Sequence, residues 1–171
     1  MKIFGPKSLS YYLFFASRIA AIGSILLVGY ILLSLRIGNY TVIQNQFQIP
    51  FPPFTETYIK GFYQQNIIVT ITLAMLFFGV FFFLLSNILK TFKAKKLFTT
   101  KAVTQLHYFA ILNLLIGPIL YFVIHFLIMK KNNFNDLHNL ILLLILGVFV
   151  LFIAAIFKQG YQVQHENDLT I

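Results

Sequence analysis

Four long apolar stretches alternate with short polar segments along the chain. Each is long enough to cross about 30 Å of hydrocarbon as an α-helix rising about 1.5 Å per residue. The stretches lie at residues 13–35, 67–89, 106–129 and 137–157. This pattern predicts an all-α integral membrane protein, with four transmembrane helices in one bundle that forms a single domain over residues 1–171.

The third apolar stretch contains Gly117-Pro118. Proline removes a backbone hydrogen bond and its ring clashes with the carbonyl four residues earlier. We therefore predict a kink in this helix, which serves helix packing.

The segments between the stretches differ in character. An outer loop of about 30 residues, residues 36–66, is rich in β-branched and aromatic residues between positions 40 and 48, which favours a short strand or hairpin. Pro50, Pro52 and Pro53 are predicted to end any strand there. An inner basic loop covers residues 90–105, and a polar tail covers residues 158–171.

Composition supports a membrane protein. The chain is 59% hydrophobic and only 10% charged, whereas a soluble domain is nearer one half apolar and about a quarter charged. Its net charge of +9 is typical of basic loops that contact anionic lipid head groups of the bilayer, and no direct nucleic-acid binding is expected. The absence of cysteine excludes disulfides, thiol nucleophiles and thiolate metal sites.

The distribution of lysine and arginine predicts the orientation, because cytoplasmic loops carry an excess of both. With both termini in the cytoplasm, eight lysines fall inside and four basic residues fall outside. The inner set is Lys2, Lys7, Lys90, Lys93, Lys95, Lys96, Lys101 and Lys158. The N- and C-termini are therefore predicted to be cytoplasmic.

Four polar residues fall in or beside the predicted spans: Arg18, Asn87, Asn113 and His125. Arg18 is close enough to the inner interface for its guanidinium to snorkel back to it, and the alternative is a buried contact with an ion or partner. Small residues around it, including Ser17 and Ala21, allow helices to approach closely. Their expected role is packing within the bundle, with a homodimer contact as the alternative.

No motif for catalysis or for a cofactor is present. The chain has no Ser-His-Asp signature, phosphate-binding loop or zincin helix. Its four histidines fall on both sides of the membrane without the spacing of metal ligands. We therefore expect a non-enzymatic protein with no metal and no cofactor.

The inner loop and the tail form the most distinctive polar region. Thr99 or Thr100 is predicted to cap a helix that runs into the third span. Glu166 and Asp168 are the acidic side chains on the cytoplasmic side, opposite a loop with five lysines. Either the tail folds back on that loop, or it binds a soluble partner. The fourth helix can also continue into the tail through Gly160, because a glycine inside a helix costs only about 1 kcal/mol of stability. The candidate partner-binding residues are Gln164, Glu166, Asp168, Leu169, Thr170, Ile171, Lys93, Lys95, Lys96, Phe98 and Thr99.

The tail resembles the C-terminal signature of a bacterial family, DUF2975. The matching residues are Phe157, Lys158, Gly160, Gln164, Glu166, Asp168, Leu169, Thr170 and Ile171. Phe98-Thr99, followed by a helix that enters the third span, resembles the family's inner loop more loosely, since Lys96-Leu97 replaces the usual Gly-x-Pro run. The four-span layout extends the resemblance over the whole chain.

The resemblance implies a multi-pass protein of the bacterial cytoplasmic (inner) membrane. Members of the family resemble partners of small helix-turn-helix transcription regulators that are encoded beside them, so the chain is expected to tether or regulate such a factor. Two alternatives stay open. One is a membrane immunity or envelope-stress protein that acts against peptides through its aromatic outer loop. The other is a small transporter or channel subunit, in which Arg18, Asn113 and His125 would face one cavity.

Overall fold

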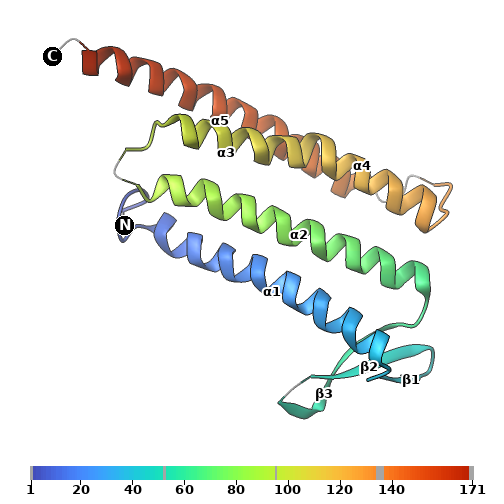
Figure 1. The fold of residues 1–171 in the computed structure, drawn as a ribbon. Helices are drawn as coiled ribbons and strands as arrows, with labels where there is room; N and C mark the ends of the chain where they lie inside the picture. Colours follow the sequence, from blue (N-terminus) through green and yellow to red (C-terminus); the bar gives the residue numbers. More distant parts are fainter. Residues whose placement is uncertain (1, 52, 95, 134–136, 170–171) are drawn as a thin grey trace.

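Four long helices, each apolar enough to cross a membrane, make up most of the protein in the computed structural model (Figure 1). The structure describes residues 2–51, 53–94, 96–133 and 137–169. The first two helices are α1 (Leu9–Ile37) and α2 (Gln65–Phe92). The third consists of α3 (Thr100–Ile111), η1 (Leu112–Ile116), α4 (Gly117–Phe122) and η2 (Val123–Ile128), and the fourth is α5 (Leu137–Leu169). Each predicted span has its own helix, so the prediction of four transmembrane helices is confirmed.

The two ends of the molecule differ. The start of α1, the loop at residues 93–99 and the end of α5 lie together at one end, which we call the basic end (Figure 1). The other end, which we call the sheet end, holds a small β-sheet and the connection from η2 to α5. The start of α1 and the end of α5 therefore lie at the same end of the molecule.

The helices pack in a row rather than around a closed ring. Among the described residues, the main contacts join α1 to α2, α2 to α3, and α3, η1 and α4 to α5, and α1 and α5 lie on opposite sides of the row (Figure 1). The α1–α2 contact is close because Gly79 faces Ala21: a Cβ at Gly79 would lie 3.7 Å from the Ala21 carbonyl oxygen. Ser17 and Ala21 are buried in this contact, as expected for packing within the chain.

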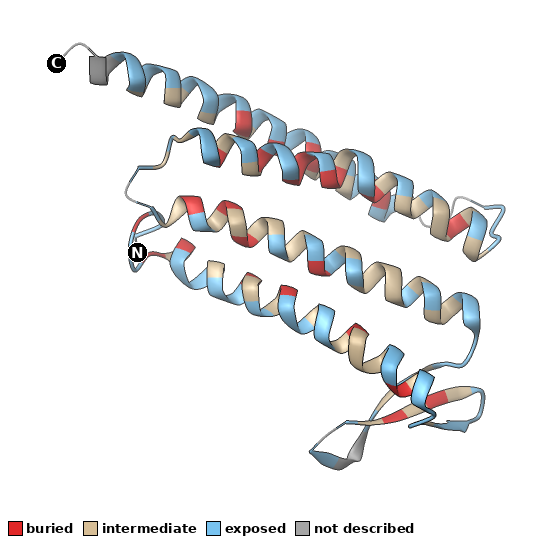
Figure 2. Cartoon of the chain, viewed as in Figure 1, coloured by how far each residue is buried: buried red, intermediate tan, exposed pale blue. Residues whose placement is uncertain are grey.

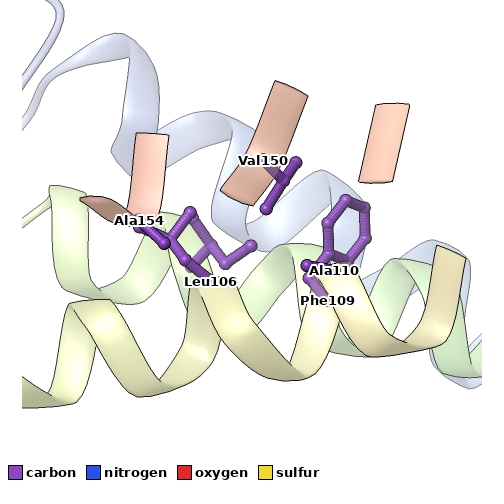
Figure 3. Close-up of a cluster of buried hydrophobic side chains, with 6 residues drawn as sticks. Leu106, Phe109, Ala110, Val150 and Ala154 are labelled. Carbon is purple, nitrogen blue, oxygen red and sulfur yellow. The ribbon is translucent and has the colours of Figure 1, made fainter. Parts of the chain in front are cut away.

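A hydrophobic core lies between α2, α3 and α5. It contains Ile88, Leu106, Phe109, Ala110, Val150 and Ala154, most of them labelled in Figure 3. Ala110 and Ala154 are both completely buried. Small residues at such contacts let two helices approach closely in lipid, where van der Waals packing is the main attraction between them.

Most of the remaining helix surface is apolar and exposed (Figure 2). Ile19 is 70% exposed, Leu127 72% and Phe152 67%. Surfaces of this kind are stable only when hydrocarbon covers them, so the burial pattern agrees with a protein embedded in a bilayer.

The third span passes Pro118 without breaking. The π-helical turn η1 lies immediately before Gly117, and a second one, η2, follows α4. Proline has no N–H to donate and its ring collides with the carbonyl of the preceding turn. A wider π-turn at this point accommodates the ring, and such π-turns often accompany kinks.

The outer loop folds into a three-stranded antiparallel sheet, in the order β1 (Thr41–Ile43), β2 (Gln46–Phe51) and β3 (Phe54–Phe62). Both Gln44 and Asn45 have positive φ, 49° and 61°, as in the two-residue turn that suits the twist of a hairpin. The prediction of a short hairpin is confirmed and extended by a third strand.

The prediction that the prolines end the strand is correct in part: β2 ends at Phe51 and Pro53 lies in the turn before β3, but Pro50 itself lies within β2. β2 continues through Pro50, which pairs with Tyr58 on β3, although the register is irregular between Pro50 and Phe51. The pairing of β1 with β2 extends only to Gln48, so Pro50 faces a single neighbouring strand. The missing N–H of proline is tolerated at such an edge position. Pro52 lies outside the described residues.

Side chains fasten the sheet to α1 and α2. The Tyr30 hydroxyl on α1 donates a hydrogen bond to the Pro50 carbonyl. Phe47 is buried, and its ring covers Gly61, where a Cβ would lie 2.6 Å from the ring. Tyr40 and Tyr63 stack and share a 2.9 Å hydrogen bond, which raises the pKa of the Tyr40 phenol because it favours the neutral form. The sheet is thus a fixed part of the fold.

Two adjacent alanines of α5 test the close packing of α5 against the core. Ala154→Leu should lower the free energy of unfolding by roughly 1–3 kcal/mol, because the added atoms must enter a filled contact. Ala155→Leu is the matched control, since Ala155 is exposed on the same helix. Thermal unfolding in detergent measures both. Equal effects of the two variants would contradict the observed α5 interface.

Candidate functional site

The loop at the basic end is anchored to α5 by Phe98. The Phe98 and Phe157 ring centroids are 5.1 Å apart. A Cβ at Gly160 would lie 2.6 Å from the Phe98 ring, so the ring occupies space that only glycine leaves open. Phe92, at the end of α2, stacks on the Phe157 ring at 5.3 Å. Three segments of the chain therefore meet around Phe157.

Thr99 begins the helix after this loop. Its side-chain oxygen accepts a 3.2 Å hydrogen bond from the Ala102 backbone N–H, and the helix then continues into the third span. The predicted cap and the predicted continuation are both confirmed. Because Thr99 follows Phe98 directly, the aromatic anchor and the helix cap together fix the end of the loop.

Lys93 is held on the opposite side of the loop, by aromatic residues of α1. Its Nζ lies 3.8 Å from the Phe14 ring centroid, 5.2 Å from that of Phe15 and 5.4 Å from that of Tyr11. Cation–π attraction of this kind is stronger where the ammonium is partly desolvated. Lys93 therefore ties α2 to α1, while Lys96 is exposed in the loop.

The N-terminal segment covers the same end. The Gly5 backbone N–H donates a 3.1 Å hydrogen bond to the Phe92 carbonyl, and the Phe4 and Phe92 rings meet edge to face at 5.7 Å. Phe92 thus connects the start of the chain, the end of α2 and, through Phe157, the end of α5.

The tail continues α5 as one helix of 33 residues that ends at Leu169. The alternative in which the helix passes through Gly160 is therefore correct, and the tail does not turn back as a separate segment. Gln164 is partly buried, whereas Glu166 is exposed. Asp168 and Leu169 belong to the helix, but the structure does not describe their side chains. Three further predicted residues lie outside the described part of the chain altogether: Lys95, Thr170 and Ile171.

Arg18 contacts two residues of α2. Its Nη1 donates a 3.2 Å hydrogen bond to Ser86 Oγ on α2, and its Cζ lies 4.3 Å above the Phe83 ring centroid. The guanidinium crosses to the neighbouring helix because Ser86 and Phe83 lie one turn apart on the face of α2 beside α1. Asn87, next to Ser86, is partly buried.

Asn113 and His125 are both buried but serve different contacts. The Asn113 Nδ2 donates a 2.7 Å hydrogen bond to the Phe109 carbonyl, and its Cβ lies 3.3 Å from the position of a Cβ on Gly147 of α5. His125 lies near the sheet end, where its Nε2 shares a hydrogen bond with the Asn133 carbonyl and its ring stacks on Tyr121 at 5.3 Å. Each side chain therefore fixes a local contact.

A cavity of about 390 Å³ lies between α2, α4 and α5. Its lining is mainly apolar and includes Phe77, Phe81, Gly117 and Leu143. Arg18, Asn113 and His125 are not in this lining, and they lie in three different contacts within the described residues. The arrangement that a transporter or channel subunit would require is therefore not formed by these three residues.

The sequence alone did not reveal two of the central contacts. The sequence predicts a small penalty for Gly160 in a helix and a family resemblance at that position, but not that its absent side chain makes room for Phe98. Nor does it indicate that Ser86 is the partner of Arg18, because that contact depends on the packing of α1 against α2. One signal in the sequence pointed to the contact at Gly160: a glycine about one turn after Phe157. A glycine inside a helix often marks a place where another part of the chain approaches closely.

Comparison with known proteins agrees with these features. Residues 39–171 match the family described as "Protein of unknown function (DUF2975)". The chain therefore belongs to the DUF2975 family, as the resemblance of its tail implied. No curated protein and no solved structure matches the chain.

A double-mutant cycle tests the Phe98–Gly160 contact. Gly160→Ala should destabilise the protein and speed trypsin cleavage at Lys96 and Lys101, because the new Cβ displaces the Phe98 ring. Combining it with Phe98→Ala should cost less than the sum of the single changes, since residues in contact are typically coupled by about 0.5–3 kcal/mol. Gln159→Ala, at an exposed neighbour, is the control. Additive effects in the double variant would show that the contact does not form.

Proposed function

We propose that this DUF2975 protein is a non-enzymatic membrane protein whose basic end holds a soluble partner, a small helix-turn-helix regulator, in the bacterial cytoplasm. The observation that supports this best is the continuous helix α5. Its apolar part, residues 137–157, already spans about 30 Å, so the last twelve residues of the helix, 158–169, extend roughly 18 Å beyond the hydrocarbon. A projecting helix of this kind is an accessible binding element.

The projecting helix is rigidly connected to the membrane domain. Phe98 and Phe157 clamp α5 to the loop just before the tail, and Phe92 extends the clamp to α2. A change in packing among the spans is therefore transmitted to the tail helix. Coupling of this type lets an event in the bilayer or at the outer sheet alter the capture of a partner.

The surface chemistry of the tail suits a regulator. Val163 is 57% exposed on a segment that lies in water, and Gln162, His165 and Glu166 are exposed around it. A mixed apolar and polar helix face is a common recognition element. DNA-binding proteins carry a basic surface, and Glu166 and Asp168 on the tail have the charge that would pair with it. Binding there would keep the regulator from DNA.

The proposal also requires one orientation of the protein in the membrane: the basic end must face the cytoplasm, because the partner is a cytoplasmic protein. The natural absence of cysteine makes single-cysteine labelling unambiguous. In intact cells, a membrane-impermeant maleimide should label Asn132→Cys at the sheet end and not Gln162→Cys on the tail. Both should react after permeabilisation. Labelling of Gln162→Cys in intact cells would place the tail outside and exclude a cytoplasmic partner.

Capture of the regulator tests the proposed function itself. The chain should be co-expressed with a small helix-turn-helix regulator of the kind encoded beside genes of this family, and purified in detergent through a tag on the N-terminus. Deletion of residues 164–171 should reduce the retained regulator by about tenfold or more, because a docking helix contributes several contacts, each worth about 1 kcal/mol or more. A second variant, Val163→Asp, should act in the same direction.

The control for this experiment is Val42→Asp, the same substitution at an exposed valine of the outer sheet. It should leave capture unchanged. Retention of the regulator by the tail-deleted chain at the level of the unaltered chain would contradict the proposed role of the tail.

A further inference from the structure

The guanidinium of Arg18 has no counter-charge among the residues that the structure describes. Among the described residues its one hydrogen-bond acceptor is Ser86 Oγ, whose own hydroxyl donates to the Phe83 carbonyl at 2.7 Å. A guanidinium carries five N–H donors. A serine oxygen and the face of one ring therefore leave most of its hydrogen-bonding capacity and all of its charge uncompensated.

No ion pair between Arg18 and a carboxylate is formed within the described residues. The acidic residues of the sequence are Glu56, Asp136, Glu166 and Asp168. In the sequence, Glu56 falls between the first two spans, Asp136 between the last two, and the other two follow Phe157. A second copy of the chain carries the same four residues outside its spans. The anion must therefore come from the lipid or from a different protein.

The depth of Arg18 suits a lipid head group. α1 has 29 residues and α2 has 28, so each exceeds a hydrocarbon layer of about 30 Å by roughly 12–14 Å. For helices centred in that layer, Ser86 lies roughly 4 Å and Arg18 roughly 8 Å inside the boundary nearest the basic end. A phosphate at the interface is within reach of a long arginine side chain at this depth.

Other side chains at the groove between α1 and α2 have the chemistry of a head-group site. Lys90 is exposed and follows Ser86 by four residues, on the same face of α2 and one turn nearer the end. Lys93 is on the next turn, held over Phe14, and Tyr11 and Phe15 are exposed beside it. Cations arranged from the boundary inward, with aromatic neighbours, are typical of sites for anionic lipids.

We propose that the α1–α2 groove binds one anionic phospholipid, from the leaflet at the basic end, through its phosphate. Arg18 and Lys90 hold the phosphate by charge-assisted hydrogen bonds, and Ser86 orients the guanidinium toward it. The lipid thus supplies the counter-charge that the protein lacks and stabilises the contact between α1 and the rest of the row. This inference does not depend on the binding of a soluble regulator.

Native mass spectrometry of the full chain tests this site. The protein is released from nanodiscs made of equal parts of phosphatidylglycerol and phosphatidylcholine with identical acyl chains. The unaltered chain should retain one phosphatidylglycerol with about tenfold preference, because both lipids carry an anionic phosphate but the choline ammonium of phosphatidylcholine is repelled by Arg18 and Lys90. Arg18→Gln should reduce the preference to near unity, because the positive charge is lost while the glutamine side chain can still contact Ser86. Lys90→Gln, at an exposed site that does not affect folding, should reduce it severalfold.

Lys101→Gln is the matched control, since Lys101 is an exposed lysine at the basic end on α3, away from this groove. It should retain the full preference. Inorganic phosphate added to the detergent-solubilised chain should not displace the lipid, because free phosphate has no acyl chains to add apolar contacts. An unchanged preference in Arg18→Gln and Lys90→Gln would overturn the proposal. The proposal would also be overturned if the unaltered chain showed no lipid preference and instead copurified with a membrane protein that is lost in Arg18→Gln.

Discussion

The close approach of helices at small residues is the contact on which the rest of this structure depends. In hydrocarbon, the lipid competes equally well for apolar side chains, so helices associate only where their surfaces fit. Gly79 against Ala21 joins α1 to α2, and Ala110 and Ala154 are buried in the core that holds α3 and α5. These contacts produce a row of helices with broad apolar faces on both sides. α1 depends on a single long contact with α2, and this is where Arg18 and its polar partner lie.

The basic end follows the same rule with larger side chains. Gly160 leaves the space that the Phe98 ring fills, and Phe157 carries both Phe92 and Phe98. Loop, helix end and tail are thereby made one unit. Glycine is required at position 160 because an aromatic ring from a loop about 60 residues earlier fills the space beside it. The polar residues that follow project from this clamp as a continuation of α5.

Polar groups within the spans are distributed rather than gathered. Asn113 bonds to its own helix, His125 closes the connection at the sheet end, and Arg18 crosses between helices. Each side chain thereby forms at least one hydrogen bond within the protein. In hydrocarbon, where no water is present, a polar group without a hydrogen bond costs free energy. No shared path results from these three residues. The structure therefore directs attention to the two ends of the protein and to the α1–α2 groove.

The number and position of the spans were determined by the sequence itself, because an apolar run of sufficient length must cross the bilayer as a helix whatever its neighbours are. The Thr99 cap and the hairpin were readable for the same reason, since each depends on a few adjacent residues. The tertiary structure alone decided which helices touch, why Gly160 is needed, and where Arg18 finds its hydrogen bond. It also decided that β2 passes Pro50, because only the short extent of β1 leaves that position at an edge. These features join residues far apart in the chain, and no local pattern specifies which distant surfaces will meet.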